Sequence, residues 1–505
     1  MGSLPDSKYI IQTDGYWFVE AHDVDPSKGY ITVSAKGIVN GLSNQPNDGA
    51  DFGPDTYNPN YSGSGIPYTQ TSGIQEALTY AYNNGGNEIR CSNGIYDTTN
   101  APYQTYTNNS GTAQAKILIG NGDGFSTEQF VNISIVGESA PNSGAEVVGT
   151  PVTTNGVVFR DLSSGSTTPS YIIGVKGSTS GLAYMTNIVL VVDNILTLVA
   201  SGNGIGGMDL KSSSMLTVPN KLVFSVSEKW PFSQPTNSNQ VAINLSGEYN
   251  ALNAVNAIYI QGGYYNGINI GHHQQINKIN VTGCYNAFYI DNSIHEGHIA
   301  SANIEYTQNI FNFASTYSTP SNTPLKISQM AIANNNNYDN GLAWMNPVSF
   351  MVIPSGVTII WAVYIDLLSY YGGIIPSNYY PTTSNNLYIG IIQYSATNIP
   401  TSSYFTGNPT ISTNPPVSGT AYQNTLPYDI LIYLPVYTST SGTAGNVKAS
   451  IGPTSTPATQ VVNDIVNSGT SSSNPRTIQL KVPAGWWYEF TGTTTTFGTA
   501  IVVAD

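Results

Sequence analysis

A short apolar–polar–apolar motif recurs between residues 240 and 315 at intervals of 20 to 25 residues. Its copies are Ile243-Asn244-Leu245, Ile268-Asn269-Ile270, Phe288-Tyr289-Ile290 and Phe311-Asn312-Phe313. A sandwich spaces its strands by about 8–12 residues. A period in the low twenties, with short strands separated by Gly and Asn, predicts a solenoid instead. Each coil then stacks on the next, and each strand pairs in parallel with its counterpart in the neighbouring coil.

The composition excludes several alternatives. Only 9% of the 505 residues are charged and three are Arg, whereas 40% are hydrophobic. Coiled coils need charged flanking positions, and nucleic-acid binders need basic patches. Disorder is excluded by the abundance of aromatic and β-branched residues. The length predicts two or three domains. We therefore expect an all-β protein that does not bind nucleic acid and has a polar, largely uncharged surface.

The scarcity of charge favours exposure to acid. Acid unfolds proteins largely by protonating carboxylates that are paired in the native state. A chain with 29 acidic and 15 basic residues, and a net charge of −14, has few such pairs to lose. A generic secreted or capsid β protein is the alternative explanation.

The N-terminal sequence MGSLPDSKYIIQTDGYW has neither a basic region nor an apolar stretch, so it does not predict a secretory signal. The apolar run from Ile359 to Leu368 is too short to span a bilayer, so no membrane insertion is expected. A virion component would combine an extracellular composition with the lack of an export signal, and so would a protein whose signal has been cleaved.

One helix is expected at residues 73–84. Ser72 is a candidate N-cap, with Gln75 three residues later as a capping box. The apolar stripe of this helix consists of Ile74, Ala77, Leu78 and Ala81. The last coil of a solenoid exposes core and strand edges, so this helix is expected to cover the N-terminal end.

Three segments are expected. Residues 1–46 form a strand-rich attachment segment, and residues 47–320 form the solenoid. After about residue 325 the strands lengthen and the period vanishes. Residues 325–505 are therefore expected to form an antiparallel β-sandwich, jelly-roll-like, that acts as a head or trimerisation domain.

The stretch from Asn47 to Thr98 resembles the opening of pectate-lyase-like right-handed β-helix proteins. The matching residues are Asp48-Gly49-Ala50-Asp51-Phe52-Gly53, Ser72-Gly73-Ile74-Gln75-Glu76-Ala77-Leu78, Gly85-Gly86 and Asn93-Gly94-Ile95-Tyr96, followed by Asn132-Ile133-Ser134-Ile135-Val136-Gly137 as a first stacked coil. The resemblance implies a right-handed parallel β-helix over about 47–315. It implies little about chemistry, because lyases, hydrolases and viral tailspikes share this fold.

The C-terminal Val482-Pro483-Ala484-Gly485-Trp486-Trp487-Tyr488 is similar to the closing segment of some viral tail-fibre head domains. With the acid-tolerant composition, the chain resembles tail adhesion spikes of spindle-shaped viruses of hot-acid archaea. That resemblance implies a homotrimer on the virion surface, attached to other tail proteins through its N-terminal segment and binding a host-surface glycan or glycoprotein. The alternative is a polysaccharide depolymerase, a glycoside hydrolase or lyase of the β-helix class.

Weak catalytic candidates for that alternative are Asp291, His295, Glu296 and Glu305. Glycosidases need paired carboxylates about 5–9.5 Å apart, and stacked coils lie about 4.8 Å apart, so acids in successive coils could pair. A solvated turn is the alternative interpretation. Gly271-His272-His273 is the string nearest to the Gly-His-Gly of polygalacturonases, but the acids that should precede it are missing.

No cofactor is expected. Asp48, Asp51 and Asp55 are weak candidates for Ca²⁺ ligands, although they lack the EF-hand order. His272, His273, His295 and His298 could converge on a metal, but solvent-exposed or capping histidines are the favoured interpretation. The two cysteines, Cys91 and Cys284, are predicted to be buried free thiols.

Aromatic residues are the candidates for ligand binding, because their flat faces stack on sugars. The selected positions are Tyr370, Tyr371, Tyr379, Tyr380, Trp486 and Trp487. In a strand, one residue of each adjacent pair points into the core. Among the N-glycosylation sequons, Asn60 and Asn108 are expected to lie in loops and are the candidate acceptors.

Overall fold

A computed structural model provides the structure of the chain. It describes residues 10–13, 16–19, 28–35, 50–54, 56, 69–84, 87–108, 111–120, 131–139, 156–165, 167–177, 188–213, 215–228, 232–247, 253–291, 297–315, 325–333, 349–354, 363–371, 387–394, 416–424, 429–438, 443–466, 476–498 and 500–504.

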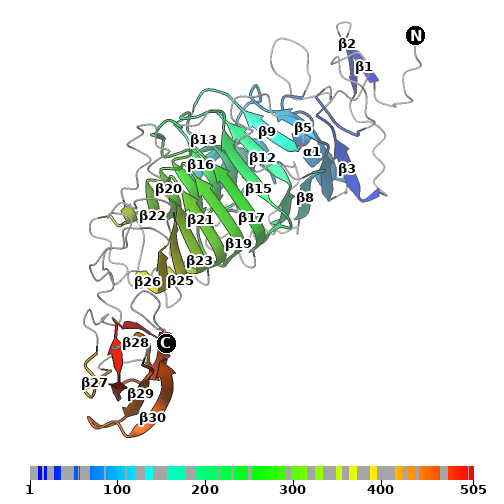
Figure 1. The fold of residues 1–505 in the computed structure, drawn as a ribbon. Helices are drawn as coiled ribbons and strands as arrows, with labels where there is room; N and C mark the ends of the chain where they lie inside the picture. Colours follow the sequence, from blue (N-terminus) through cyan, green and yellow to red (C-terminus); the bar gives the residue numbers. More distant parts are fainter. Residues whose placement is uncertain are drawn as a thin grey trace. The chain divides into compact units, whose positions relative to one another are not determined.

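Two long, mostly parallel sheets dominate the chain (Figure 1). The smaller sheet has the order β24 (Ser349–Val352), β22 (Asn309–Phe313), β20 (Asn286–Ile290), β18 (Asn266–Ile270), β16 (Val241–Leu245), β13 (Ile205–Asp209), β10 (Ser170–Val175), β7 (Gly111–Ile119) and β6 (Gln104–Asn108). Only β6 is antiparallel to its neighbour in this sheet.

The larger sheet is built from strands that alternate along the chain with those of the smaller sheet. Its main path is β25 (Val363–Tyr371), β23 (Leu325–Ala333), β21 (His298–Glu305), β19 (Gln274–Thr282), β17 (Asn253–Gln261), β14 (Met215–Val218), β11 (Ile188–Asp193), β8 (Val131–Gly137), β4 (Glu88–Cys91) and β3 (Tyr30–Val33). A branch carries β15 (Leu222–Val226), β12 (Ile195–Val199), β9 (Val157–Asp161) and β5 (Gly94–Asp97).

The repeated motif forms the rungs of the smaller sheet. Ile243 pairs with Ile268, Ile268 with Phe288, and Phe288 with Phe311, all in parallel strands. These four side chains are fully buried. The stacked-coil arrangement predicted from the period is therefore confirmed. The chain is a β protein with long parallel sheets, consistent with a parallel β-helix or solenoid.

A buried row of amides reinforces the stack. Asn286 Nδ2 donates to Asn266 Oδ1 at 2.8 Å, and Asn309 Nδ2 donates to Asn286 Oδ1 at 2.9 Å. Each amide bonds to its counterpart one coil away, 20 or 23 residues along the chain. Within this row Asn286 both donates and accepts, Asn266 accepts and Asn309 donates, so the buried amides partner one another.

Parallel pairing extends beyond residues 47–320 in both directions. β3, at residues 30–33, pairs in parallel with β4, and β23, β24 and β25 continue the two sheets as far as Tyr371. The interval between the paired strands β22 and β24 is longer than in the central coils. The low-twenties period is therefore lost from the sequence while the pairing continues.

The single described helix, α1 (Ile74–Asn84), begins close to the predicted position. Ile74, Ala77, Leu78 and Ala81 are all buried, so the predicted apolar stripe is confirmed. The prediction that Ser72 caps the helix is wrong. Ser72 has a left-handed backbone with φ of 56°, and its hydroxyl donates to the Asp97 carbonyl.

Threonines take over the capping role. Thr71 Oγ1 accepts a hydrogen bond from the Gln75 amide, and Thr69 Oγ1 accepts one from the Gly73 amide. The side chain of Gln75 bonds to both backbone groups of Leu118 in β7 instead of closing a capping box. These bonds attach the helix to the smaller sheet.

The chain separates into two compact units. The first comprises Met1–Tyr379 with Gln393–Asn398, and the second comprises Tyr380–Ile392 with Ile399–Asp505. β26 (Leu387–Tyr394) spans the point where this division runs. A hairpin of β1 (Ile10–Thr13) and β2 (Tyr16–Val19) belongs to the first unit.

The second unit contains two small antiparallel sheets. One has the order β27 (Ala421–Gln423), β32 (Trp487–Thr493), β29 (Gly445–Gly452) and β30 (Thr459–Val466). In the other, β28 (Ile430–Thr438) lies between β31 (Arg476–Val482) and β33 (Thr495–Phe497), and also pairs with β34 (Ile501–Ala504). Both sheets contribute to one apolar core that includes Leu434, Val447 and Phe490.

Candidate functional site

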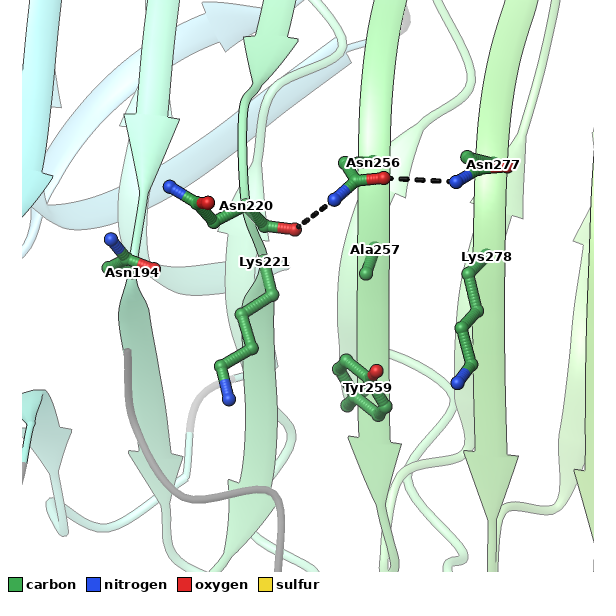
Figure 2. Close-up of a pocket in the computed structure, with 8 residues that line it drawn as sticks. All are labelled: Asn194, Asn220, Lys221, Asn256, Ala257, Tyr259, Asn277 and Lys278. Carbon is green, nitrogen blue, oxygen red and sulfur yellow. Dashed lines mark hydrogen bonds between the residues drawn. The ribbon is translucent and has the colours of Figure 1, made fainter. Parts of the chain in front are cut away.

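An open groove crosses successive strands of the larger sheet. Its volume is about 320 Å³, and Figure 2 shows the residues that line it. They come from the turns before β12 and β15 and from β17 and β19, and comprise Asn194, Asn220, Lys221, Asn256, Ala257, Tyr259, Asn277 and Lys278. We call this site the amide–lysine groove.

Asparagines form one side of the groove. Asn256 Nδ2 donates to the Asn220 carbonyl at 3.1 Å, and Asn277 Nδ2 donates to Asn256 Oδ1 at 3.0 Å (Figure 2). All three residues are exposed, unlike the buried row on the smaller sheet. An exposed amide that is already held by its neighbour presents its remaining donor and acceptor positions in a fixed direction.

A tyrosine between two lysines forms the other side. Lys221 Nζ lies 5.9 Å from the centroid of the Tyr259 ring, and Lys278 Nζ lies 5.5 Å from it. Figure 2 shows the two lysine side chains extending along the strands on either side of the ring. Tyr259 also packs against a buried apolar cluster that includes Leu196 and Val223. The ring is therefore supported from within the sheet.

The turn that carries Asn220 and Lys221 is held by a buried carboxylate. Asp193 accepts hydrogen bonds from the Asn220 amide at 2.8 Å, from Asn220 Nδ2 at 2.5 Å and from the Lys221 amide at 3.2 Å. Asn194 follows in a left-handed conformation with φ of 54°, which Asn tolerates better than most residues. The backbone amide of Asn194 donates to the backbone carbonyl of Lys221.

This arrangement is suited to binding a hydroxyl-rich ligand. Amides exchange hydrogen bonds with hydroxyls as both donors and acceptors, a supported tyrosine offers an apolar surface with a polar tip, and lysines add positive charge. None of the eight lining residues is an acid. The groove therefore has the chemistry of a recognition surface and lacks the carboxylate pair that glycosidases use.

A second hollow of about 810 Å³ lies beside β3, β4 and β8. Its cation, Arg90, bonds to Glu88 at 2.8 Å and lies over the Tyr30 ring at 3.8 Å. The charge of Arg90 and the face of the Tyr30 ring are thus already occupied by contacts within the protein. Fewer free binding groups remain for a ligand here than in the amide–lysine groove.

One carboxyl group with a raised pKa lies inside the first unit. Asp209 is fully buried, and its Oδ2 accepts hydrogen bonds from Tyr106 Oη and Asn108 Nδ2, each at 2.8 Å. Burial raises the pKa of Asp209, opposed by these two hydrogen bonds and by the charge of Lys211. Lys211 is also buried, and its Nζ lies 3.9 Å from Asp291 Oδ2. Because Asp209, Lys211, Tyr106 and Asn108 are all buried, we interpret this cluster as a structural hydrogen-bond network.

Two of the four catalytic candidates can be placed. Asp291 lies near Lys211, as described above, and Glu305 Oε1 accepts a hydrogen bond from Asn303 Nδ2 at 2.8 Å. His295 and Glu296 lie outside the described residues. The catalytic interpretation therefore stays a prediction.

The aromatic candidates are divided between the two units. Tyr370 and Tyr371 are the last two residues of β25, while Tyr379 and Tyr380 lie outside the described residues. Trp486 and Trp487 are both half-buried, and Trp486 packs against the core of the second unit. Part of the Trp486 surface thus contacts that core, and the role of both tryptophans in ligand binding stays a prediction.

The metal candidates are only partly described. Asp51 is buried and its Oδ2 accepts from the amide and hydroxyl of Thr32, both at 2.8 Å, while Asp48 and Asp55 lie outside the described residues. His298 Nε2 lies 3.0 Å from Ser328 Oγ. Within the described ranges, no three His, Cys, Asp or Glu side chains form a group that could hold a metal ion.

The remaining predictions concern the two cysteines and the two candidate N-glycosylation sites. Cys91 and Cys284 are buried free thiols, as predicted, and burial raises the pKa of Cys284 to about 12. Asn108 is buried, and its Nδ2, the atom that would carry a glycan, donates to Asp209. Asn60 lies outside the described residues.

Sequence reasoning did not find the amide–lysine groove. Its asparagines are 36 and 21 residues apart, and nothing in the sequence shows that they share one side of a sheet. Aligning the second strand of each coil would have revealed the rung that pairs Ala257 with Lys278. The ligand-binding candidates predicted from the sequence are pairs of adjacent aromatic residues. This criterion passes over Tyr259, which has no aromatic neighbour in the chain.

The fold defines the class of protein, a β protein built on long parallel sheets. No protein-family model matches the sequence, and no curated protein matches it. In the described part of the chain, no helix combines the length and apolarity needed to cross a bilayer.

Proposed function

We propose that the protein is an adhesion protein of a virus particle, a tail or surface spike that binds a host-surface glycan or glycoprotein without cleaving it. The observation that carries this proposal is the amide–lysine groove, which is open, rich in amides and without carboxylates in its lining. The resemblance of residues 47–98 to β-helix proteins, among them viral tailspikes, supports the same conclusion.

The finer architecture belongs to the same proposal. The parallel coils wind as a right-handed β-helix, and α1 covers their N-terminal end. The burial of Ile74 and Leu78 and the bonds from Gln75 to Leu118 support this placement of the helix. The second unit is a jelly-roll-like sandwich that acts as a head or locks a homotrimer. The N-terminal residues join the spike to other tail proteins.

The environment is proposed to be extracellular and acidic. Burial raises the pKa of both Asp209 and Glu76, so the folded chain holds protons on these two carboxyls more readily than the unfolded chain does. Such groups favour the folded state at low pH. The low charged fraction acts in the same direction.

A binding assay on host envelope polysaccharide, run beside an assay for new reducing ends and unsaturated sugars, tests the proposal. We expect binding without turnover, weakened by Tyr259→Ala. Tyr371→Ala and Tyr379→Ala test the aromatic positions predicted from the sequence. Turnover that Asp291→Asn or Glu296→Gln abolishes would replace the adhesin with the depolymerase alternative.

A further inference from the structure

The two lysines of the amide–lysine groove flank one tyrosine ring and, like Lys28, Lys176 and Lys448 among the described residues, form no ion pair with a carboxylate. Lys116, Lys211, Lys326 and Lys481 each lie within 4 Å of a carboxylate oxygen, and Arg90, Arg160 and Arg476 do so as well. Within the described residues, Lys221 and Lys278 form no such pair, although acids outnumber bases 29 to 15.

A comparison within the same sheet sharpens this point. Lys326 in β23 also approaches a tyrosine ring, that of Tyr364, at 5.6 Å. There the positive charge is compensated, because Lys326 Nζ lies 3.5 Å from Asp366 Oδ2. Lys221 and Lys278 have the same tyrosine contact but no carboxylate.

Asp193, which bonds to the Lys221 backbone amide, forms no ion pair with either lysine. Asp193 is buried, and its two oxygens accept hydrogen bonds from the amides of Asn220 and Lys221 and from the Asn220 side chain. Both oxygens of Asp193 are therefore occupied by hydrogen bonds within the turn, and neither pairs with a lysine ammonium group. The exposed face of the groove keeps two positive charges on a protein whose net charge is −14.

The two lysines lie on either side of β17. Leu222, which follows Lys221, pairs with Ile258, and Lys278 pairs with Ala257, so both lysines lie level with Ala257. Neighbouring strands are about 4.8 Å apart, which separates the two backbones by about 10 Å. The exposed amides of Asn256 and Asn277 run parallel to this line.

We propose that the amide–lysine groove binds an anionic polysaccharide that runs across the strands. Its carboxylate or sulfate groups meet Lys221 and Lys278, its hydroxyls bond to the amide row, and a sugar ring packs on Tyr259. The proposal rests on the function proposed above and specifies the chemical class of the ligand.

A polysaccharide fits these residues better than other anionic polymers do. Nucleic acids are held by extended basic stripes with repeated phosphate contacts, whereas the lining of the groove contains two lysines. The groove offers two point charges among several neutral amides. That ratio suits a polymer with many hydroxyls and few charges.

The test uses three polymers with one backbone: dextran, carboxymethyl dextran and dextran sulfate. Binding to the full chain is measured by titration calorimetry at low salt. We expect both charged polymers to bind at least about tenfold more tightly than dextran, with an affinity that falls as salt rises. Lys221→Gln with Lys278→Gln should remove most of that advantage. Lys448→Gln, an exposed lysine of the second unit, is the control and should leave affinity within about twofold.

Measurements at pH 3 and pH 7 separate the two anions. Carboxylates lose charge near pH 4, so carboxymethyl dextran should bind less tightly at pH 3 while dextran sulfate keeps its affinity. Equal binding of dextran and the charged polymers, or no effect of the double lysine variant, would overturn the anionic ligand and leave the glycan adhesin intact. Tighter binding of single-stranded DNA than of dextran sulfate would also overturn it. If neither these polymers nor host envelope polysaccharide bind, the proposed function itself fails.

Discussion

Tyr106 donates a 2.8 Å hydrogen bond to Asp209, although 103 positions separate the two residues in the chain. The bond joins the antiparallel strand β6 to the parallel strand β13. Burial raises the pKa of Tyr106 as well, and the neighbouring charge of Asp209 raises it further. Both groups thus favour their protonated forms in the folded chain.

This relationship gives a prediction about pH. The stability that a carboxyl with a raised folded pKa contributes is fully present below its unfolded pKa, 3.8 for Asp209, and is lost as the pH rises through the folded pKa. Asp209→Asn cannot titrate, so its melting temperature should gain on that of the wild type as the pH rises from 4 towards 7. Thermal unfolding monitored by circular dichroism measures this difference.

Asp97→Asn supplies the opposite control. Although burial opposes it, hydrogen bonds from Arg160 and Thr99 lower the pKa of Asp97. The stability that Asp97 contributes is present above its unfolded pKa and is lost as the pH falls, so this variant should lose ground to the wild type as the pH rises. Parallel pH profiles of the two variants would contradict the explanation.

The buried amide row predicts a large cost for one substitution. Asn286→Ala leaves Asn266 Oδ1 and Asn309 Nδ2 without the hydrogen bonds that Asn286 makes to them inside the stack. We expect the free energy of unfolding to fall by about 2–4 kcal/mol, because unpaired buried polar groups cost about 1–3 kcal/mol each. Asn277→Ala removes an exposed amide of the groove and should change stability by less than about 0.5 kcal/mol. Equal effects in a denaturant titration would argue against a structural role for the buried row.

Helix α1 offers a test of end covering. Ile74 is fully buried, so Ile74→Asp should destabilise the chain by a few kcal/mol through an uncompensated charge in the core. Thr79, on the exposed side of the same helix, is the matched position, and Thr79→Ala should be nearly neutral. Hydrogen exchange at the Leu118 amide, which donates to Gln75, reports whether the helix has detached. Unchanged exchange in Ile74→Asp would contradict the covering role.

Assembly is the fourth prediction. We expect multi-angle light scattering to give a homotrimer at micromolar concentration. The low charge of the chain suits wide polar interfaces between the protomers. A stable monomer under these conditions would remove the trimer from the proposal. Deleting residues 399–505 should weaken the assembly if the second unit locks it.

The parallel stacking was predictable because the apolar residues of one rung recur at a visible interval. Ile268, Phe288 and Phe311 mark positions that any stacked coil must fill. The end of the stack was not predictable in the same way. The paired residues Asn309 and Ser349 of β22 and β24 are 40 positions apart, and Leu325 and Val363 of β23 and β25 are 38 apart. These intervals exceed the low-twenties period, so the sequence does not reveal that the strands still pair.

The groove escaped prediction for a different physical reason. Most of its residues are polar, and Asn220, Asn256, Asn277 and Lys278 are exposed, so hydrophobic periodicity does not detect them. Tyr259 and Lys278 belong together only because β17 and β19 are in a particular register. The same holds for Asp209, whose partners on β6 are brought to it by tertiary folding.

The rung-by-rung construction of the buried amide row has a consequence for how such a chain can change over time. Asn286 bonds to an asparagine in each neighbouring coil, and the buried apolar rung beside it pairs Ile268 with Phe288 and Phe288 with Phe311. A whole coil can therefore be inserted or deleted while the coils on either side still meet compatible neighbours. We expect lineages of this chain to lengthen or shorten in steps of about one coil.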